Sequence, residues 1–118
     1  MKRTAYAIGM SAEDAVVAAY SAEGLAIRAR RLRTKAGELD ILAEREGLLA
    51  AVEVKCRPTL ADAALSLTER QRARLAAAIE IVLAENPDWG AAGARFDLVV
   101  VDRAGRMRRV ADAFRAGD

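Results

Sequence analysis

The stretch GELDILAEREGLLAAVEVKC, residues 37–56, holds two short apolar segments separated by the charged connection Glu44-Arg45-Glu46-Gly47. The segments at 39–43 and 48–55 have the length and composition of β-strands, and the short connection ends in glycine. We therefore predict two antiparallel strands joined as a hairpin.

Acidic and basic side chains recur at alternate positions of these two strands. Because strand side chains alternate between faces, Glu38 and Asp40 should share one face, and Glu53 and Lys55 should share one face of the next strand. If the loop holds an even number of residues, the two polar faces coincide. One such register places Asp40 opposite Glu53 and Glu38 opposite Lys55.

Two carboxylates in this position need compensation. At about 5 Å apart they repel by roughly 3 kcal/mol at an effective dielectric of 20, and like charges directly across a ladder are destabilising. A divalent cation turns this repulsion into ligation, and Mg²⁺ or Mn²⁺ prefers hard oxygen ligands. The alternative is a solvated strand face with Glu38 and Lys55 as an ordinary ion pair.

The rest of the chain surrounds this hairpin with helices and strands. Ser11 is a suitable N-cap for the first helix, and Thr68 and Gln71 have capping-box spacing at the start of the second. The order α-β-β-β-α-β-β predicts an α/β fold in one domain over residues 1–118. Beyond the hairpin, the expected elements are a helix at 11–23, a strand at 25–33, a helix at 68–85, and strands at 96–102 and 106–111.

Glu13 lies on the apolar side of the first predicted helix. A helical wheel places it with Val16, Val17 and Tyr20, whereas Asp14 points away. An acid on an apolar face is costly unless something compensates it. Glu13 is therefore a candidate for a functional site, although a first-turn Glu stabilised by the helix dipole is the simpler alternative.

The composition removes several kinds of chemistry. The chain has no His and one Cys, which excludes catalytic triads, Cys-His pairs and zinc sites that need imidazole or several thiolates. Carboxylates, Lys or Arg must therefore carry any reaction. No apolar run approaches the roughly 18 residues of a membrane span, so we expect a soluble cytoplasmic protein that has no membrane partner.

Five cations are concentrated in the eight residues from Arg28 to Lys35, with no acid among them. The guanidinium fork of Arg suits phosphate, which favours nucleic acid as a partner; the alternative is a solvated face. Gln71 could reach a phosphate or could cap its own helix. Only 4 % of residues are aromatic, so a base-stacking platform of the RNA-recognition type is not expected.

Several motifs together resemble the YraN family of uncharacterised bacterial proteins, which is similar to archaeal Holliday-junction resolvases of the restriction-endonuclease-like superfamily. The match runs from Gly9 to Val101. Its elements are Glu13 and Tyr20 in the first helix, Gly37-Glu38-Leu39-Asp40, Glu53-Val54-Lys55-Cys56-Arg57, and Arg95-Phe96-Asp97. The chain departs from the family pattern with Arg31 in place of Asn, Cys56 in place of Thr, and Gln71 in place of Lys.

The resemblance implies a restriction-endonuclease-like fold, with a central mixed β-sheet flanked by α-helices. It also implies an Mg²⁺ or Mn²⁺ site made by Asp40, Glu53 and the Val54 carbonyl. Lys55 would act as catalytic base or positioner, and Glu13 would support the metal. Residues expected to contact nucleic acid are Arg30, Arg33, Arg57 and Gln71.

The leading functional hypothesis is a metal-dependent endonuclease acting on structured or branched DNA. A homodimer would suit the symmetric strands of such a substrate. Two alternatives remain open: a non-catalytic nucleic-acid-binding module with structural carboxylates, and a protein-interaction domain whose Arg surface meets an acidic partner.

Overall fold

The hairpin predicted around residues 37–56 forms as two paired strands. A computed structural model describes residues 5–61 and 67–114 of the chain, with side chains described for 12–61 and 67–113. Strand β2 (Gly37–Arg45) pairs antiparallel with β3 (Leu48–Cys56), from Ile41 opposite Val52 to Arg45 opposite Leu48. Glu46 and Gly47 form the turn with φ of +52° and +80°. Two positive φ angles are typical of the hairpin turn that matches strand twist.

The order α-β-β-β-α-β-β is confirmed. The sheet follows chain order, β1-β2-β3-β4-β5, and all neighbours are antiparallel except β3 and β4. Helix α2 makes the crossover that this parallel pair requires. The other elements are α1 (Ala5–Ala22), β1 (Ala26–Thr34), α2 (Glu69–Glu85), β4 (Gly93–Val101) and β5 (Met107–Phe114).

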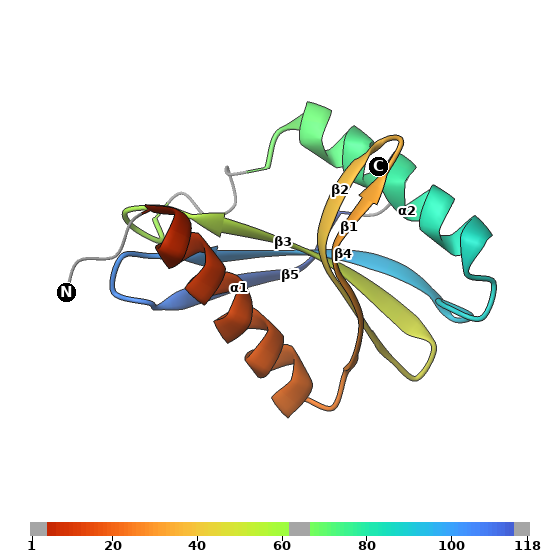
Figure 1. Ribbon diagram of the computed structural model, residues 1–118, viewed down its shortest axis with the longest axis horizontal. Helices are drawn as coiled ribbons and strands as arrows, with labels where there is room; N and C mark the ends of the chain where they lie inside the picture. Colours follow the sequence, from red (N-terminus) through yellow and green to blue (C-terminus); the bar gives the residue numbers. More distant parts are fainter. Residues whose placement is uncertain (1–4, 62–66, 115–118) are drawn as a thin grey trace.

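The helices cover opposite faces of the mixed sheet, as the resemblance implies (Figure 1). The α1-side cluster contains Val16 and Tyr20 of α1 with Ile41 and Val52 of the sheet. The α2-side cluster packs the apolar stripe of α2 against the other face; its buried members from α2 are Leu75, Ala78, Ile79 and Val82. None of the described helices is long and apolar enough to span a membrane.

The two helix starts differ in how well the sequence predicts them. Helix α2 begins after Thr68, whose side chain accepts from Gln71 N–H while Gln71 accepts from the Thr68 N–H, so the capping box is confirmed. The prediction that Ser11 caps the first helix is wrong, because α1 already begins at Ala5. The residues before Ser11 include Ala and Met, which are good helix formers, and these extend the helix past the expected cap.

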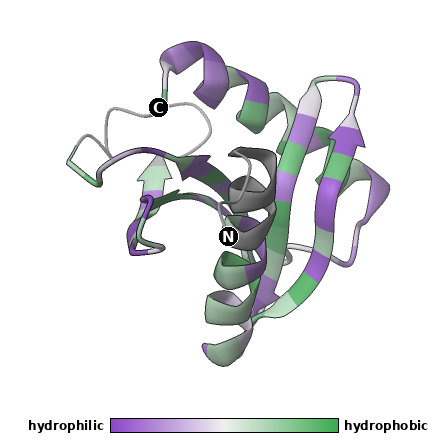
Figure 2. Ribbon diagram, turned by 60° about the vertical axis from the view of Figure 1, so that its left-hand side comes forward, coloured by the Kyte–Doolittle hydropathy of each residue, from purple (hydrophilic) through white to green (hydrophobic). Residues whose placement is uncertain are grey.

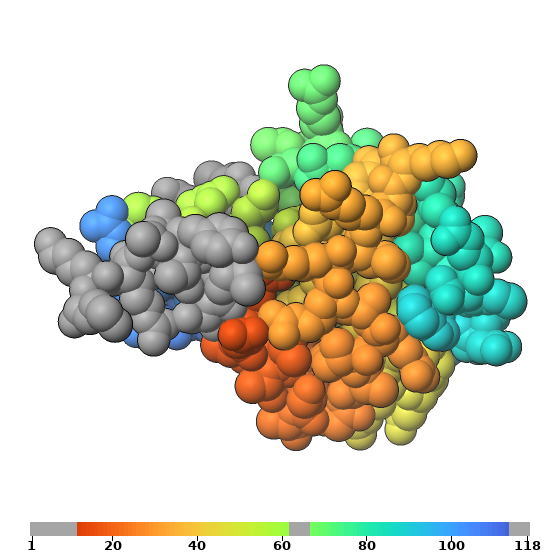
Figure 3. Space-filling view, viewed as in Figure 1, coloured from red at the N-terminus to blue at the C-terminus, as the bar shows by residue number. Residues whose placement is uncertain are grey.

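Near Arg31, the side chains of β1 change the face of the sheet toward which they point. Ala29 and Leu32 both pack against the α2-side cluster although they are three residues apart, whereas regular alternation would place them on opposite faces. Arg31 between them has φ of +50°, so the pleat breaks at this residue. Figure 2 shows the hydrophilic and hydrophobic bands along this hairpin, and the side chains of β1 occupy the centre of the face in Figure 3 (orange).

The same change of facing occurs on β2 at Asp40. Leu39 and Leu42 both belong to the α2-side cluster, and the register of their neighbours places Arg31 across from Asp40. The ladder with β3 ends at Ile41, whereas the ladder with β1 continues to Gly37. Strand β2 therefore leaves β3 at Asp40 and carries the hairpin toward α2.

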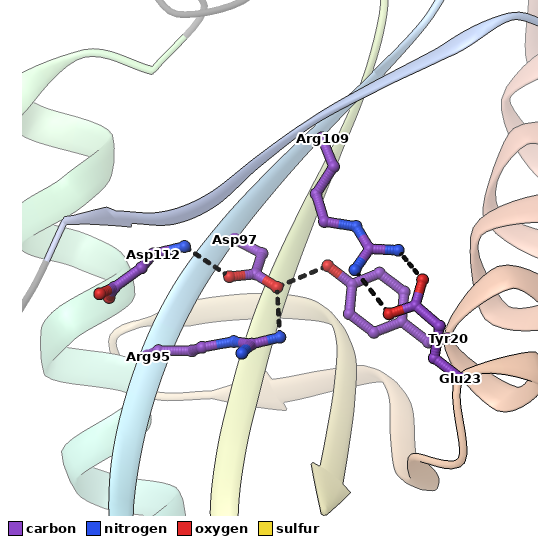
Figure 4. Close-up of polar contacts among 6 residues, drawn as sticks. All are labelled: Tyr20, Glu23, Arg95, Asp97, Arg109 and Asp112. Atoms are coloured by element: carbon purple, nitrogen blue, oxygen red, sulfur yellow. Dashed lines mark hydrogen bonds and ion pairs between the residues drawn. The ribbon is translucent and has the colours of Figure 1, made fainter.

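Helix α1 is fixed to the sheet by a buried acid on β4 (Figure 4). Asp97 is 2 % exposed; it accepts from the Tyr20 hydroxyl at 2.6 Å, from the Asp112 N–H at 2.8 Å and from Arg95 at 3.2 Å. Burial and the bond to Asp97 raise the pKa of Tyr20, so the hydroxyl stays a donor. Arg109 covers the Tyr20 ring, 4.4 Å from its centroid.

Removing the Tyr20 hydroxyl should destabilise the chain without emptying the core. Tyr20→Phe keeps the ring but leaves a buried carboxylate oxygen short of a donor, so we expect a loss of about 1–3 kcal/mol in the free energy of unfolding. Urea denaturation of Tyr20→Phe, Asp97→Asn and the double variant measures the coupling between the two side chains. Strictly additive losses would contradict this account.

Candidate functional site

Asp40 lies where the β2–β3 ladder ends, and its carboxylate continues the hydrogen bonding beyond that point. Its Oδ2 accepts from the backbone N–H of Val54 at 2.9 Å. If the ladder continued, a backbone carbonyl of β2 would accept the hydrogen bond from this N–H, but β2 has turned away from β3. The side chain thus replaces the missing carbonyl, and this fixes the carboxylate beside β3.

Glu53 meets Asp40 from the neighbouring strand. The last pair of the β2–β3 ladder is Ile41 opposite Val52, so Asp40 and Glu53 are the next residues on the two strands, and Asp40 is close enough to Glu53 to affect the protonation of its carboxyl group. Burial, then the Asp40 side chain and its charge, raise the pKa of Glu53 to about 8, against the opposing effect of Lys55 and Arg74. The Glu53 carboxyl group therefore stays largely protonated near neutral pH.

The pair differs from every fully buried acid in the described residues. Each of those four acids has an Arg ion pair within 4.0 Å: Glu13 with Arg31, Glu44 with Arg28, Asp97 with Arg95, and Asp102 with Arg106. Asp40 and Glu53 have no such ion pair in the described part of the chain. The Glu53 carboxyl group is instead kept neutral by its raised pKa, and a bound cation would stabilise its charged form.

Two cations lie on the same side of the sheet as the pair. Leu49 and Ala51 of β3 belong to the α2-side cluster, and by alternation Glu53 and Lys55 continue that face. Arg74 reaches the pair from α2 closely enough to lower the pKa of Glu53. The arrangement can hold a divalent cation on the carboxylates and a phosphate on the cations.

Sequence reasoning did not select Arg74. Its position follows from the β1–β2 hairpin, since a Cβ at Gly37 would lie 2.7 Å from Arg74 Cδ. The absence of a side chain at Gly37 lets the Arg74 stem lie against the hairpin. Helical spacing places Arg74 on α2, but nothing in the sequence indicates which strand it meets.

Glu13 lies on the other side of the sheet and has a partner of its own. It is 9 % exposed and packs with the α1-side residues, as its helical position predicts. Arg31 donates to its Oε2 from Nε at 3.0 Å and from Nη2 at 2.6 Å, whereas Oε1 is buried without a hydrogen bond. Its metal-supporting role stays a prediction: across 5–61 and 67–114, no three acidic or Cys side chains form a group that could hold a metal.

The Arg residues expected to contact nucleic acid have different surroundings. Arg30 donates to Asp14 of α1 at 2.9 Å, so an acid already occupies it. Arg33 is freer: its side chain is 89 % exposed and lies 3.8 Å from Glu38. Arg57 is exposed and donates to the carbonyl of its neighbour Cys56 at 2.8 Å.

Gln71 is occupied by its own helix. Its Oε1 accepts from the Thr68 N–H at 2.9 Å, so the capping alternative describes its contacts. Its role toward a phosphate stays a prediction, as do those of Arg30, Arg33 and Arg57.

Comparison with known proteins gives a family and no activity. The model of the uncharacterised protein family UPF0102 matches residues 12–101. A UPF0102 protein of Granulibacter bethesdensis is 58 % identical over 107 residues, 91 % of this chain and 68 % of the relative. A UPF0102 protein of Azorhizobium caulinodans is 46 % identical over 96 % of this chain and 86 % of its own length. One from Acidiphilium cryptum is 46 % identical over 99 % and 91 %.

The raised pKa of Glu53 predicts that the metal-free chain loses stability as pH rises. The folded value of about 8 lies above the ordinary 4.5, so between these pH values the folded state binds more protons than the unfolded state, and the free energy of unfolding falls. Glu53→Gln stays neutral and should be more stable than the parent at pH 8–9 by about 1–3 kcal/mol, but not near pH 4.

Urea denaturation in EDTA across pH 4–9 measures this difference. Glu46→Gln, the same substitution in the exposed β2–β3 turn, is the control and should follow the parent. Parallel pH profiles for the parent and Glu53→Gln would contradict the prediction.

Proposed function

This chain belongs to the uncharacterised protein family UPF0102, and we propose that it is a divalent-metal-dependent endonuclease that hydrolyses phosphodiester bonds in structured or branched DNA. The observation that carries the proposal is the position of Asp40 beside Glu53 at the point where β2 leaves β3, on the face that also presents Lys55. Hydrolysis by this set of side chains requires no imidazole, which agrees with the absence of His from the chain.

The carboxyl pair fits Mg²⁺ or Mn²⁺ by its donor chemistry. Asp40 and Glu53 offer hard oxygen ligands, and the raised pKa of Glu53 beside Asp40 indicates a place where positive charge is favoured. The Val54 carbonyl is the further ligand implied by the family resemblance. The Val54 N–H bond to Asp40 fixes this backbone segment relative to the pair.

Each side chain then has a distinct role at a scissile phosphate. When bound, the metal supplies Lewis acidity toward the phosphoryl oxygens and lowers the pKa of an attacking water. Asp40 and Glu53 hold the metal, and Lys55 orients the water or stabilises charge developing on the phosphate. Arg74, on α2, binds a phosphate oxygen. The exposed Arg33 binds the flanking DNA backbone and so extends the contact along β1.

A non-catalytic nucleic-acid-binding module is the second candidate, and the position of Glu13 favours it. Arg31 neutralises the acid that would support the metal, and Asp40 already accepts from Val54. In this case the carboxyl pair is structural. DNA binding would fall steeply with salt and would not respond to EDTA.

Metal titration separates the two candidates. Calorimetry with Mn²⁺ should show binding to the parent chain and to Glu46→Gln. For Asp40→Asn and Glu53→Gln we expect affinity to fall at least about 10-fold, because each loses one charged oxygen ligand. Equal Mn²⁺ binding by all four proteins would overturn the assignment of the site.

Cleavage gives the direct test of the reaction. Four-way-junction, flap and linear duplex DNA are incubated with the protein in Mn²⁺. Asp40→Asn and Lys55→Ala should reduce the rate by about 10²–10⁴-fold, whereas Glu46→Gln should retain it. Equal cleavage by the variants would point to a contaminating nuclease, and absence of cleavage on every substrate would count against the proposal.

A further inference from the structure

A groove of about 790 Å³ lies between β1 and the end of α2. We call it the β1–α2 groove, lined among others by Leu32, Arg33, Lys35, Ile81, Glu85 and Trp89. Figure 3 shows the side chains of β1 (orange) bordering those of α2 and the following segment (teal). The proposed catalytic side chains are not among its lining residues, so the groove is a separate feature of the same molecule.

The apolar part of the groove contains the only Trp of the chain. Trp89 is half-buried, because it packs against the α2-side cluster while also lining the groove. Leu32 and Ile81 complete this apolar lining. An indole beside aliphatic side chains provides a flat surface for a planar aromatic ligand, and bases of single-stranded nucleic acid stack on such side chains without regard to sequence.

The polar residues of the groove carry opposite charges on its two sides. Arg33, near the end of β1, and Lys35, just after it, are exposed, and Arg33 lies 3.8 Å from Glu38. Glu85, from the last turn of α2, is exposed on the other side. A phosphate fits the cationic side, and Glu85 can accept from the amino group of a nucleobase.

The β1–α2 groove lies a short distance along β1 from the candidate catalytic site. The hairpin register places Arg31 across from Asp40. Lys35 is four residues further along, about 13 Å in an extended chain. A strand that leaves the carboxyl pair along β1 therefore reaches the groove within a short segment.

We propose that the β1–α2 groove binds an unpaired nucleobase, stacked against Trp89, with the adjoining phosphate on Arg33 and Lys35. Stacked base pairs of a duplex do not expose a base face to Trp89, so the preferred DNA has a single-stranded segment. As a statement about the nuclease substrate, this inference rests on the proposed function. The binding itself does not require cleavage.

The single Trp allows the groove to be observed directly. In EDTA, the full chain is titrated with a 12-nucleotide single-stranded DNA of mixed sequence, and with the corresponding 12-base-pair duplex, while Trp emission is recorded. The single strand should quench the emission and the duplex should not. Arg33→Ala/Lys35→Ala should weaken single-strand binding at least 10-fold and reduce the slope of log K against log salt by about 1.4.

Arg103→Ala/Arg108→Ala is the matched control, because it removes two exposed cations from the β4–β5 end of the molecule. It should change single-strand affinity by less than twofold. Absence of quenching, equal quenching by single strand and duplex, an equal loss in the control, or equal quenching by a Glu-rich peptide would each overturn the inference.

Asp40→Asn separates this inference from the proposed function. It should quench like the parent, since the groove does not contain the carboxyl pair. A chain that binds the single strand but cleaves no substrate in Mn²⁺ would leave the groove in place and remove the nuclease. A chain that cleaves DNA in Mn²⁺ but shows no quenching by the single strand would support the nuclease and remove the groove as a binding site.

Discussion

The Asp40 carboxylate accepts a hydrogen bond from the backbone N–H of Val54 at the point where β2 and β3 separate. The arrangement of the candidate site depends on this bond. A buried N–H without an acceptor costs about 1–3 kcal/mol, so two strands cannot separate in a protein interior unless another group replaces the lost carbonyl. The Asp40 side chain does so here. It therefore lets the β1–β2 hairpin bend toward α2, and the same bond holds the carboxylate against Glu53.

The four buried acids of the described residues are compensated differently from the half-buried carboxyl pair. Glu13, Glu44, Asp97 and Asp102 each have an Arg within ion-pair distance, which is the common way to make a buried charge tolerable. Part of the Arg excess of this chain is thus used inside its own structure, and Arg clustering alone says little about an external partner. Glu53, beside Asp40, instead has a raised pKa, which the charges of Lys55 and Arg74 only partly offset.

The two faces of the sheet carry different groups of polar side chains. On the α1 side, the Tyr20–Asp97 contact and the Glu13–Arg31 ion pair fix the helix to the sheet. On the α2 side lie the carboxyl pair, its cations and the β1–α2 groove. If the site is catalytic, substrate approaches from the α2 side, and Glu13 affects it only through Arg31 at the break in β1.

The sequence by itself determined the order of elements, the β2–β3 hairpin and the capping box of α2. These follow from local periodicity, turn residues and side-chain spacing, which act over a few residues. The start of α1 was missed because helix propensity before Ser11 outweighed a good local cap. Only the tertiary structure decided that Arg31 would neutralise Glu13 and that Arg74 would reach Glu53. Those contacts depend on a break in the pleat and on the packing of a distant helix, and no short-range pattern records either one.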